Sequence, residues 1–266
     1  MTGNASPKKP FKDKTMRLVT AALFAALSLA VKPFEIYLLP VARLNFVAVP
    51  IIMAGIVLGP VWGGAVGLIA DILGYLLMDK SGAAINPILT VSSIMLGVIP
   101  GLIFLKHKTK ELKQIKYTLF NIVSYVILLG AAALLLITEG SLKLEGGAMY
   151  ILSPSSGQFS LVSWWIVGGI TAAFIAYSIA VMTMFGSKKK DELSVRQDNP
   201  KVLFAITISV IIADIIISGL GLGIQYGWPL TLMLIVRILK GFFTIPVFTF
   251  ICLILYRVIK KLKLNI

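Results

Sequence analysis

Long apolar runs, separated by short polar or basic segments, fill most of the chain. A helix needs about 20 largely apolar residues to cross a bilayer, so these runs predict membrane-spanning helices. The predicted spans are residues 18–31, 46–58, 61–78, 86–105, 117–138, 161–185, 202–222 and 230–256. The pattern therefore predicts an all-α fold, a polytopic membrane helical bundle of about eight spans.

The stretch from Arg43 to Tyr75 is the most informative part of this pattern. Its two apolar segments are separated only by Gly59-Pro60-Val61-Trp62, and so short a connection with Gly and Pro predicts an antiparallel helix pair. Such a pair places Arg43 and Asp71 toward the same membrane face. An ionisable residue inside a span costs roughly 2.5–3.5 kcal/mol on insertion scales, so it normally faces a cavity or a partner. We therefore interpret this stretch as half of a ligand site.

Composition supports the membrane assignment and excludes several functions. With 58% hydrophobic and 14% charged residues, the chain has too little polar surface for a water-soluble protein of this length. The net charge of +14 does not indicate nucleic-acid binding, because membrane proteins place such charge in loops that meet anionic lipid. The single cysteine, Cys252, and the single histidine, His107, exclude a disulfide framework and a Cys- or His-based metal site. We expect neither a metal nor a cofactor.

Basic residues predict the orientation in the membrane. Most of the 25 lysines and arginines lie before the first span, in 106–116, in 188–201 and in 257–263. If these segments are cytoplasmic, the outer loops hold only Lys32, Arg43, Lys80 and Lys143, as the positive-inside rule requires. We therefore predict a multi-pass protein of the cell membrane with both termini cytoplasmic.

The same topology divides the chain into four parts. They are a basic N-terminus (1–17), the first four spans (18–105), a basic loop with a two-span hairpin (106–201), and the last two spans with a basic tail (202–266).

Five ionisable residues converge near the outer membrane surface in this topology. They are Arg43, Asp71, Asp214, Arg237 and Lys240. The spacing of three between Arg237 and Lys240 puts both on one helix face. The set predicts a ligand site. The alternative is structural ion pairing that neutralises buried charge, for example between Asp71 and Arg237 or Lys240.

Aromatic residues cluster at the same face. Phe46, Tyr75 and Trp228 suit stacking on a planar ligand, although each is also typical of an interfacial belt. The outer loop 79–90 contains the Gly and Pro of a lid or of an ordinary connector. The predicted substrate-binding residues are Arg43, Phe46, Asp71, Tyr75, Asp214, Trp228, Arg237 and Lys240.

Small residues suggest close helix contacts in two places. Ala22, Ala26 and Ala30 form a stripe along the first span that lets another helix approach, although alanine is also common in membrane helices. Glycines 55, 59, 63 and 67 share the same period of four, and we expect them to pack the second and third spans together.

These motifs carry a resemblance to a known family. The first span, Arg43-Leu-Asn-Phe46, Pro50-Ile-Ile-Met-Ala-Gly55, Leu58-Gly-Pro60, Gly63-Gly64, Gly67 and Asp71 look like the vitamin-binding S components of energy-coupling factor (ECF) transporters. The ending Arg237-Ile-Leu-Lys240-Gly-Phe-Phe-Thr-Ile-Pro246 is similar to their last helix. The resemblance covers roughly residues 16–105 and 202–262, and the Arg-x-x-Phe entry looks most like the folate-specific members.

The resemblance implies a bundle that binds a vitamin from outside and is not an enzyme. In that family, import needs a transmembrane T subunit and two cytoplasmic ATPases, and the small-residue motif of the first helix docks on the T subunit. Ala22 and Ala26 would take that role here. The sequence has no G-x-x-x-x-G-K-[ST] phosphate loop, which agrees with a separate motor. S components typically have six helices, so the resemblance implies a six-helix core with an inserted hairpin at 117–185.

A folate ligand would match the predicted residues. Its amino-pyrimidine edge suits a carboxylate such as Asp71 or Asp214. Its two glutamate carboxylates suit Arg43, Arg237 or Lys240, with the arginines favoured for bidentate geometry.

Three alternatives stay open from the sequence. Within the same family, pantothenate, riboflavin, thiamin or another heterocycle is the nearest competitor to folate. A self-sufficient secondary transporter would need repeats and a midplane site, which the pattern does not indicate. A membrane enzyme would need a nucleophile, base or metal constellation, and the sequence offers none.

Overall fold

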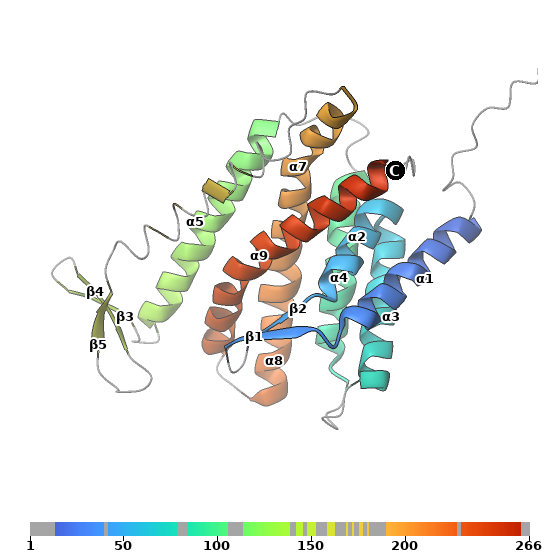
Figure 1. Ribbon diagram of the computed structural model, residues 1–266. Coiled ribbons are helices and arrows are strands. Elements are labelled where there is room, and N and C mark those ends of the chain that lie inside the picture. Colours follow the sequence, from blue (N-terminus) through green and yellow to red (C-terminus); the bar gives the residue numbers. More distant parts are fainter. Residues whose placement is uncertain are drawn as a thin grey trace, which may run out of the picture.

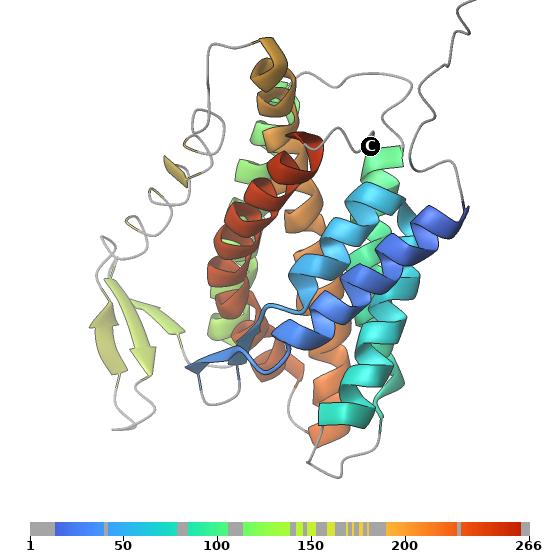
Figure 2. The ribbon, with the colours of Figure 1, turned by 45° about the vertical axis from the view of Figure 1, so that its right-hand side comes forward.

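The computed structural model describes residues 14–39, 42–78, 85–105, 114–138, 142–145, 148–152, 159–162, 169, 172, 176–177, 180, 190–227 and 230–261. Helices stand side by side and form the body of the protein (Figures 1 and 2). They are α1 (Lys14–Val31), α2 (Ala48–Leu58), α3 (Pro60–Met78), α4 (Pro87–Leu105), α5 (Gln114–Thr138), α7 (Lys190–Ser209), the π-helix η2 (Val210–Ile217), α8 (Ser218–Tyr226) and α9 (Leu230–Lys261). Segments α7, η2 and α8 follow one another without a break, so they form one long helical element.

Six helical elements among the described residues are long and apolar enough to cross a membrane. They correspond to α1, α3, α4, α5, the α7–η2–α8 element and α9. The predicted all-α polytopic membrane bundle is confirmed. The predicted second span is the 11-residue helix α2, which is shorter than a span, and most of the predicted span 161–185 lies outside the described residues.

Two short sheets lie in the connections between the helices, where the sequence analysis predicted no strands. Strands β1 (Glu35–Leu39) and β2 (Ala42–Asn45) form an antiparallel hairpin between α1 and α2. Strands β3 (Leu142–Glu145), β4 (Ala148–Leu152) and β5 (Phe159–Val162) form an antiparallel sheet after α5, in the segment predicted as a polar loop. The sequence predicts a polar loop at residues 139–160, and the strands found there correct that prediction.

Glycines bring α2, α3 and α4 together at backbone distance. A Cβ atom at Gly55 would overlap the carbonyl of Gly97, and one at Gly97 would overlap the carbonyl of Gly63. A Cβ at Gly67 would likewise overlap the carbonyl of Ser93. The glycine pattern therefore does pack the second and third helices, as the sequence predicts, and it also joins both of them to α4.

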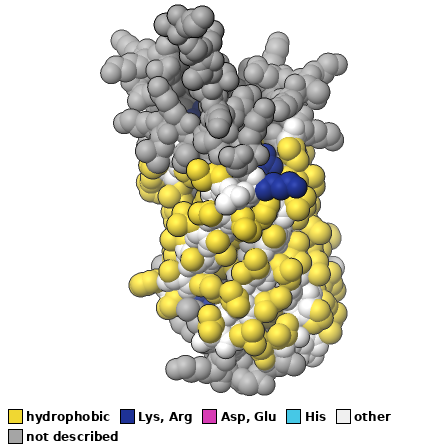
Figure 3. Space-filling view, turned by 90° about the vertical axis from the view of Figure 1, so that its right-hand side faces the viewer, with side chains coloured by type: hydrophobic (Ala, Val, Ile, Leu, Met, Phe, Trp, Pro, Cys, Tyr) yellow, Lys and Arg dark blue, Asp and Glu magenta, His cyan; other side chains and the backbone are white. Residues whose placement is uncertain are grey.

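The described surface agrees with a lipid environment. Hydrophobic side chains cover the face that Figure 3 shows. The buried core runs through α2, α7, η2 and α9, and its largest fully buried side chains include Ile51, Met53, Leu203 and Ile245. Burial is therefore greatest along α2, the α7–η2–α8 element and α9, which carry several of the predicted site residues.

Helix α5 packs on α7 and α9 through aromatic side chains. The rings of Tyr117 and Phe120 lie 5.3 and 4.8 Å from that of Phe204 on α7. Tyr125 lies 5.9 Å from Phe242 on α9. The α5 segment is thus joined to the same two elements that bear Asp214, Arg237 and Lys240.

Candidate functional site

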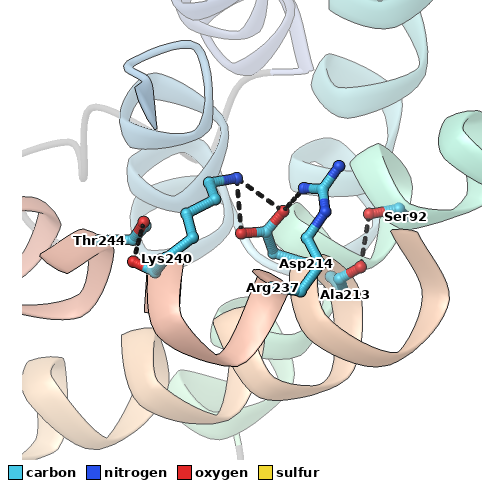
Figure 4. Close-up of polar contacts among 6 residues, drawn as sticks. All are labelled: Ser92, Ala213, Asp214, Arg237, Lys240 and Thr244. Atoms are coloured by element: carbon cyan, nitrogen blue, oxygen red, sulfur yellow. Dashed lines mark hydrogen bonds and ion pairs between the residues drawn. The ribbon is translucent and has the colours of Figure 1, made fainter. Parts of the chain in front are cut away.

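A carboxylate and two cations meet between η2 and α9. Arg237 Nη1 lies 2.7 Å from Asp214 Oδ1, and Lys240 Nζ lies 2.8 Å from Asp214 Oδ2. Figure 4 shows Asp214 between the two basic side chains. Asp214 comes from η2, while Arg237 and Lys240 lie one turn apart on α9, as their spacing of three requires. We call these three residues the charged cluster.

The charged cluster is largely shielded from solvent. The side chains of Asp214, Arg237 and Lys240 are 15%, 13% and 8% exposed. Charges at such positions are stable only when they are paired and hydrogen-bonded. Arg237 donates to Asp214 through one of its five N–H groups, and no other hydrogen bond of its guanidinium is present among the described residues.

Asp214 sits in an unusual stretch of helix. The eight residues of η2 adopt the π-helical conformation, which is rare and frequently marks functional sites. Sequence analysis gave no indication of this stretch, because a π-helix is defined by its hydrogen-bond register and not by composition.

Asp71 lies apart from the cations and is held by hydroxyl groups of α4. Thr90 donates to Asp71 Oδ2 at 2.6 Å, and Ser93 donates to Oδ1 at 3.3 Å. The ion pair between Asp71 and Arg237 or Lys240 that the sequence offered as an alternative is not present among the described residues. Asp214, and not Asp71, forms the ion pairs with Arg237 and Lys240.

Helix α4 connects both acidic residues. Ser92, between Thr90 and Ser93 in sequence, donates to the carbonyl of Ala213 at 2.7 Å. One helical turn of α4, which rises about 5 Å, therefore contacts Asp71 on one side and the residue before Asp214 on the other. The two carboxylate-bearing segments thus lie at the same level of α4.

The start of α4 is fixed to α8 as well. The side-chain amide of Asn86 donates to the carbonyl of Gly221 at 2.9 Å and to Gln225 Oε1 at 3.0 Å. Residues 79–84, most of the segment that the sequence suggests as a lid or connector, lie outside the described residues.

The other predicted binding residues lie on different elements, and one of them is outside the described residues. Arg43 lies in β2, opposite Tyr37 of β1, and β2 contacts α9; the Arg43 side chain is outside the described set. Phe46 follows β2 and packs on Phe248 of α9, with ring centroids 6.5 Å apart. Tyr75 is half-buried on α3, one turn beyond Asp71. Trp228 lies outside the described residues.

Sequence analysis missed the hydroxyl groups of α4. Thr90, Ser92 and Ser93 form a polar patch, Thr-Val-Ser-Ser, within an otherwise apolar span. This polar patch is the sequence feature that could have indicated these hydroxyl groups. It is weak, because serine and threonine in helices usually bond to their own backbone.

The predicted docking residues face outward. Ala22 and Ala26 are exposed on α1, whereas Ala21 and Ala25 of the same helix are buried against the bundle. The small-residue stripe is therefore accessible from outside the protein.

The charged cluster has the chemical groups of a ligand-binding site. Within the described part of the chain, no group of three or more His, Cys, Asp or Glu residues is placed to hold a metal ion. The charged cluster offers guanidinium and ammonium donors beside a carboxylate acceptor. This arrangement suits a small ligand that carries both an anionic group and hydrogen-bond donors.

Comparison with known proteins gives one family and two relatives. The family described as "ECF transporter, substrate-specific component" matches residues 16–256. An uncharacterized protein of Mycoplasma pneumoniae is 27% identical over 174 residues, which cover 64% of this chain and 59% of that protein. The folate transporter FolT of Clostridium novyi is 35% identical over 69 residues, which cover 26% of this chain and 39% of FolT. The chain thus spans less than two thirds of either relative. No solved structure matches it.

Proposed function

Because this chain belongs to the substrate-specific components of ECF transporters, we propose that it captures a vitamin, namely a folate, at the outer membrane face for import. The observation that carries the proposal is the charged cluster, in which Arg237 and Lys240 share the carboxylate of Asp214 inside a membrane bundle. The partial similarity to the folate transporter FolT of Clostridium novyi supports folate over other vitamins.

Folate chemistry matches the cluster and its surroundings. The glutamate tail of folate carries two carboxylates, which pair with the guanidinium of Arg237 and with Arg43 on the neighbouring strand β2. The amino-pyrimidine edge donates hydrogen bonds to a carboxylate, for which the candidates are Asp214 and Asp71. Phe46, Tyr75 and Trp228 provide the flat apolar contacts for the rings.

The proposal also includes partner proteins. As in the ECF family, import is driven by a T subunit and two cytoplasmic ATPases, and the lack of a phosphate loop for ATP in this sequence agrees with a separate motor. Both termini lie in the cytoplasm of a cell whose plasma membrane holds the protein. The T subunit docks on the exposed face of α1, where Ala22 and Ala26 allow close helix approach.

Arg43 provides the test of the ligand site. Arg43→Ala in purified protein should weaken folate binding about tenfold to a hundredfold, since hydrogen bonds to charged groups are worth roughly 1.5–3 kcal/mol. Quenching of tryptophan fluorescence by folate measures the affinity. The same variant should bind 6-methylpterin, which keeps the amino-pyrimidine edge but lacks both carboxylates, as well as the unchanged protein does.

Lys143→Ala is the matched control, because Lys143 is an outer cation on β3 that belongs to none of the predicted site residues. Its folate affinity should stay unchanged. Equal folate affinity of Arg43→Ala and the unchanged protein would remove Arg43 from the site. Tighter binding of pantothenate, riboflavin or thiamin than of folate would show that folate is not the vitamin. Uptake by the chain alone in proteoliposomes would favour a secondary transporter.

A bulky side chain on α1 should separate docking from binding. Ala22→Trp and Ala26→Trp should abolish co-purification with the T subunit and leave folate affinity unchanged, because both positions face away from the bundle. Leu27→Trp is the control, since Leu27 is exposed on α1 and already large. If Ala22→Trp and Ala26→Trp both still co-purify with the T subunit, the docking surface lies elsewhere.

A further inference from the structure

The hydrogen-bond register of η2 changes at Asp214. The backbone N–H of Ser218 donates to the carbonyls of Ala213 and Ile215, five and three residues earlier. In an α-helix, its acceptor would be the carbonyl four residues earlier, which is that of Asp214. The N–H of Ser218 therefore bonds to the carbonyls on either side of Asp214 and not to that of Asp214 itself.

Ser92 supports this register from the neighbouring helix. Its hydroxyl, in a side chain 5% exposed, donates to the carbonyl of Ala213 at 2.7 Å (Figure 4). Ala213 thus accepts both from Ser218 within its own helix and from Ser92 on α4. Two donors on one carbonyl favour the conformation in which that carbonyl is turned toward α4.

Five other buried serine and threonine hydroxyls of the described residues behave differently. Each of them donates to the carbonyl four residues earlier in its own helix, which is the usual bond for serine and threonine in helices. They are Ser28, Thr207, Ser209, Thr244 and Thr249. Ser92 instead bonds across to another element.

We propose that Ser92 is a positioning residue of the ligand site: its hydroxyl holds η2 in the π-helical register and thereby directs Asp214 toward Arg237 and Lys240. A change of register by one residue turns a helix face by about 100°, which would move Asp214 away from α9. The effect on the helix register is independent of the ligand, whereas the effect on affinity rests on the proposed function.

The position of Ser92 gives α4 a second role. Thr90 and Ser93, in the same turn, hold Asp71 on α3. A displacement of this turn would therefore move both carboxylates together. Ser92 makes the orientation of Asp214 depend on where α4 lies.

Hydrogen–deuterium exchange of the ligand-free protein in detergent tests the register. Ser92→Ala should increase amide exchange in peptides that cover residues 210–220 severalfold and leave α1 and α5 unchanged. Ser28→Ala, which removes a buried hydroxyl bonded within α1, should leave 210–220 unchanged. Ser92→Thr should restore the slow exchange. If Ser92→Ala does not fold, Ser92→Cys, with its weaker S–H donor, should show an intermediate rate.

Folate titration tests the link to binding. Ser92→Ala should weaken folate binding about fivefold to tenfold, the size expected for one hydrogen bond. In an Asp214→Asn background the same change should have little effect, because residues that act through one another are not additive. Ser92→Thr should bind as the unchanged protein does.

The two experiments separate the possible failures. Unchanged exchange in 210–220, or independent effects of Ser92→Ala and Asp214→Asn on affinity, would overturn the positioning role. Failure of the unchanged protein to bind any of the vitamins would overturn the proposed function, while the exchange measurement would still decide the role of Ser92.

Discussion

Asp214→Ala should lower the free energy of unfolding by about 3–5 kcal/mol, because it leaves Arg237 and Lys240 in a buried site without their shared carboxylate. Removing one partner from a buried ion pair is costly for this reason, even where the intact pair adds little net stability. Denaturant unfolding of the purified protein in detergent, followed by tryptophan fluorescence, measures the change.

Two further variants show whether charge is the cause. Asp71→Ala should cost less, about 1–2 kcal/mol, because it leaves only hydroxyls behind and Thr90 can also donate to the carbonyl of Asn86. The triple variant Asp214→Leu, Arg237→Met, Lys240→Met should regain most of the stability and should not bind folate. Equal losses for Asp214→Ala and Asp71→Ala would contradict the charged-cluster explanation.

Gly97→Ala should destabilise the protein by about 3 kcal/mol, because the added methyl group would overlap the carbonyl of Gly63 and force α3 and α4 apart. The overlap is difficult to relieve, because the backbone of a packed helix cannot shift without displacing the helices beside it. Thermal unfolding in detergent measures the loss, which we expect as a lower melting temperature together with weaker folate binding.

Gly130→Ala is the matched control for this substitution. Gly130 lies on α5, and a Cβ there would meet no atom within 4 Å. Alanine also favours the helix by about 1 kcal/mol over glycine. The control should therefore be neutral or stabilising. A melting temperature of Gly97→Ala equal to that of Gly130→Ala would show that α3 and α4 can separate without cost.

Helix positions were largely predictable from the sequence. The predicted span 61–78 is α3, Pro60–Met78, and the predicted span 86–105 is α4, Pro87–Leu105. In both, proline at the start and a polar segment at the end limit an apolar run, so local signals decide the boundaries. The long helix that contains Asp214 begins at Lys190 and not at the predicted 202, because a polar helical extension gives no hydropathy signal.

The strands were not predictable in this way. The hairpin at 35–45 depends on pairing between Tyr37 and Arg43, and that pairing is invisible to hydropathy when each strand has only four or five residues. The three strands after α5 are missed for the same reason. Arg43 was therefore expected at the entry of a helix, whereas it lies in a strand that contacts α9.

Residue counting predicts a level for each charged residue along its span, but it does not predict rotation about the helix axis. Residue counting placed Asp71, Asp214, Arg237 and Lys240 in the outer half of the bundle. It could not decide which aspartate meets the cations, since that depends on the π-helical register and on hydroxyls of α4 that contact neighbouring helices. Side-chain partners across helices are set by packing, which a single sequence does not display.

The position of α5 has a consequence for the opposite side of the bundle. Helix α5 and the sheet that follows it lie on one flank of the molecule, and α1 lies on the opposite flank (Figures 1 and 2). Tyr177, farther along the chain, donates to the carbonyl of Pro246, so this part of the chain is held to α9. Because α5 lies on the far side, it widens the bundle there and leaves the exposed residues of α1, among them Ala22 and Ala26, uncovered.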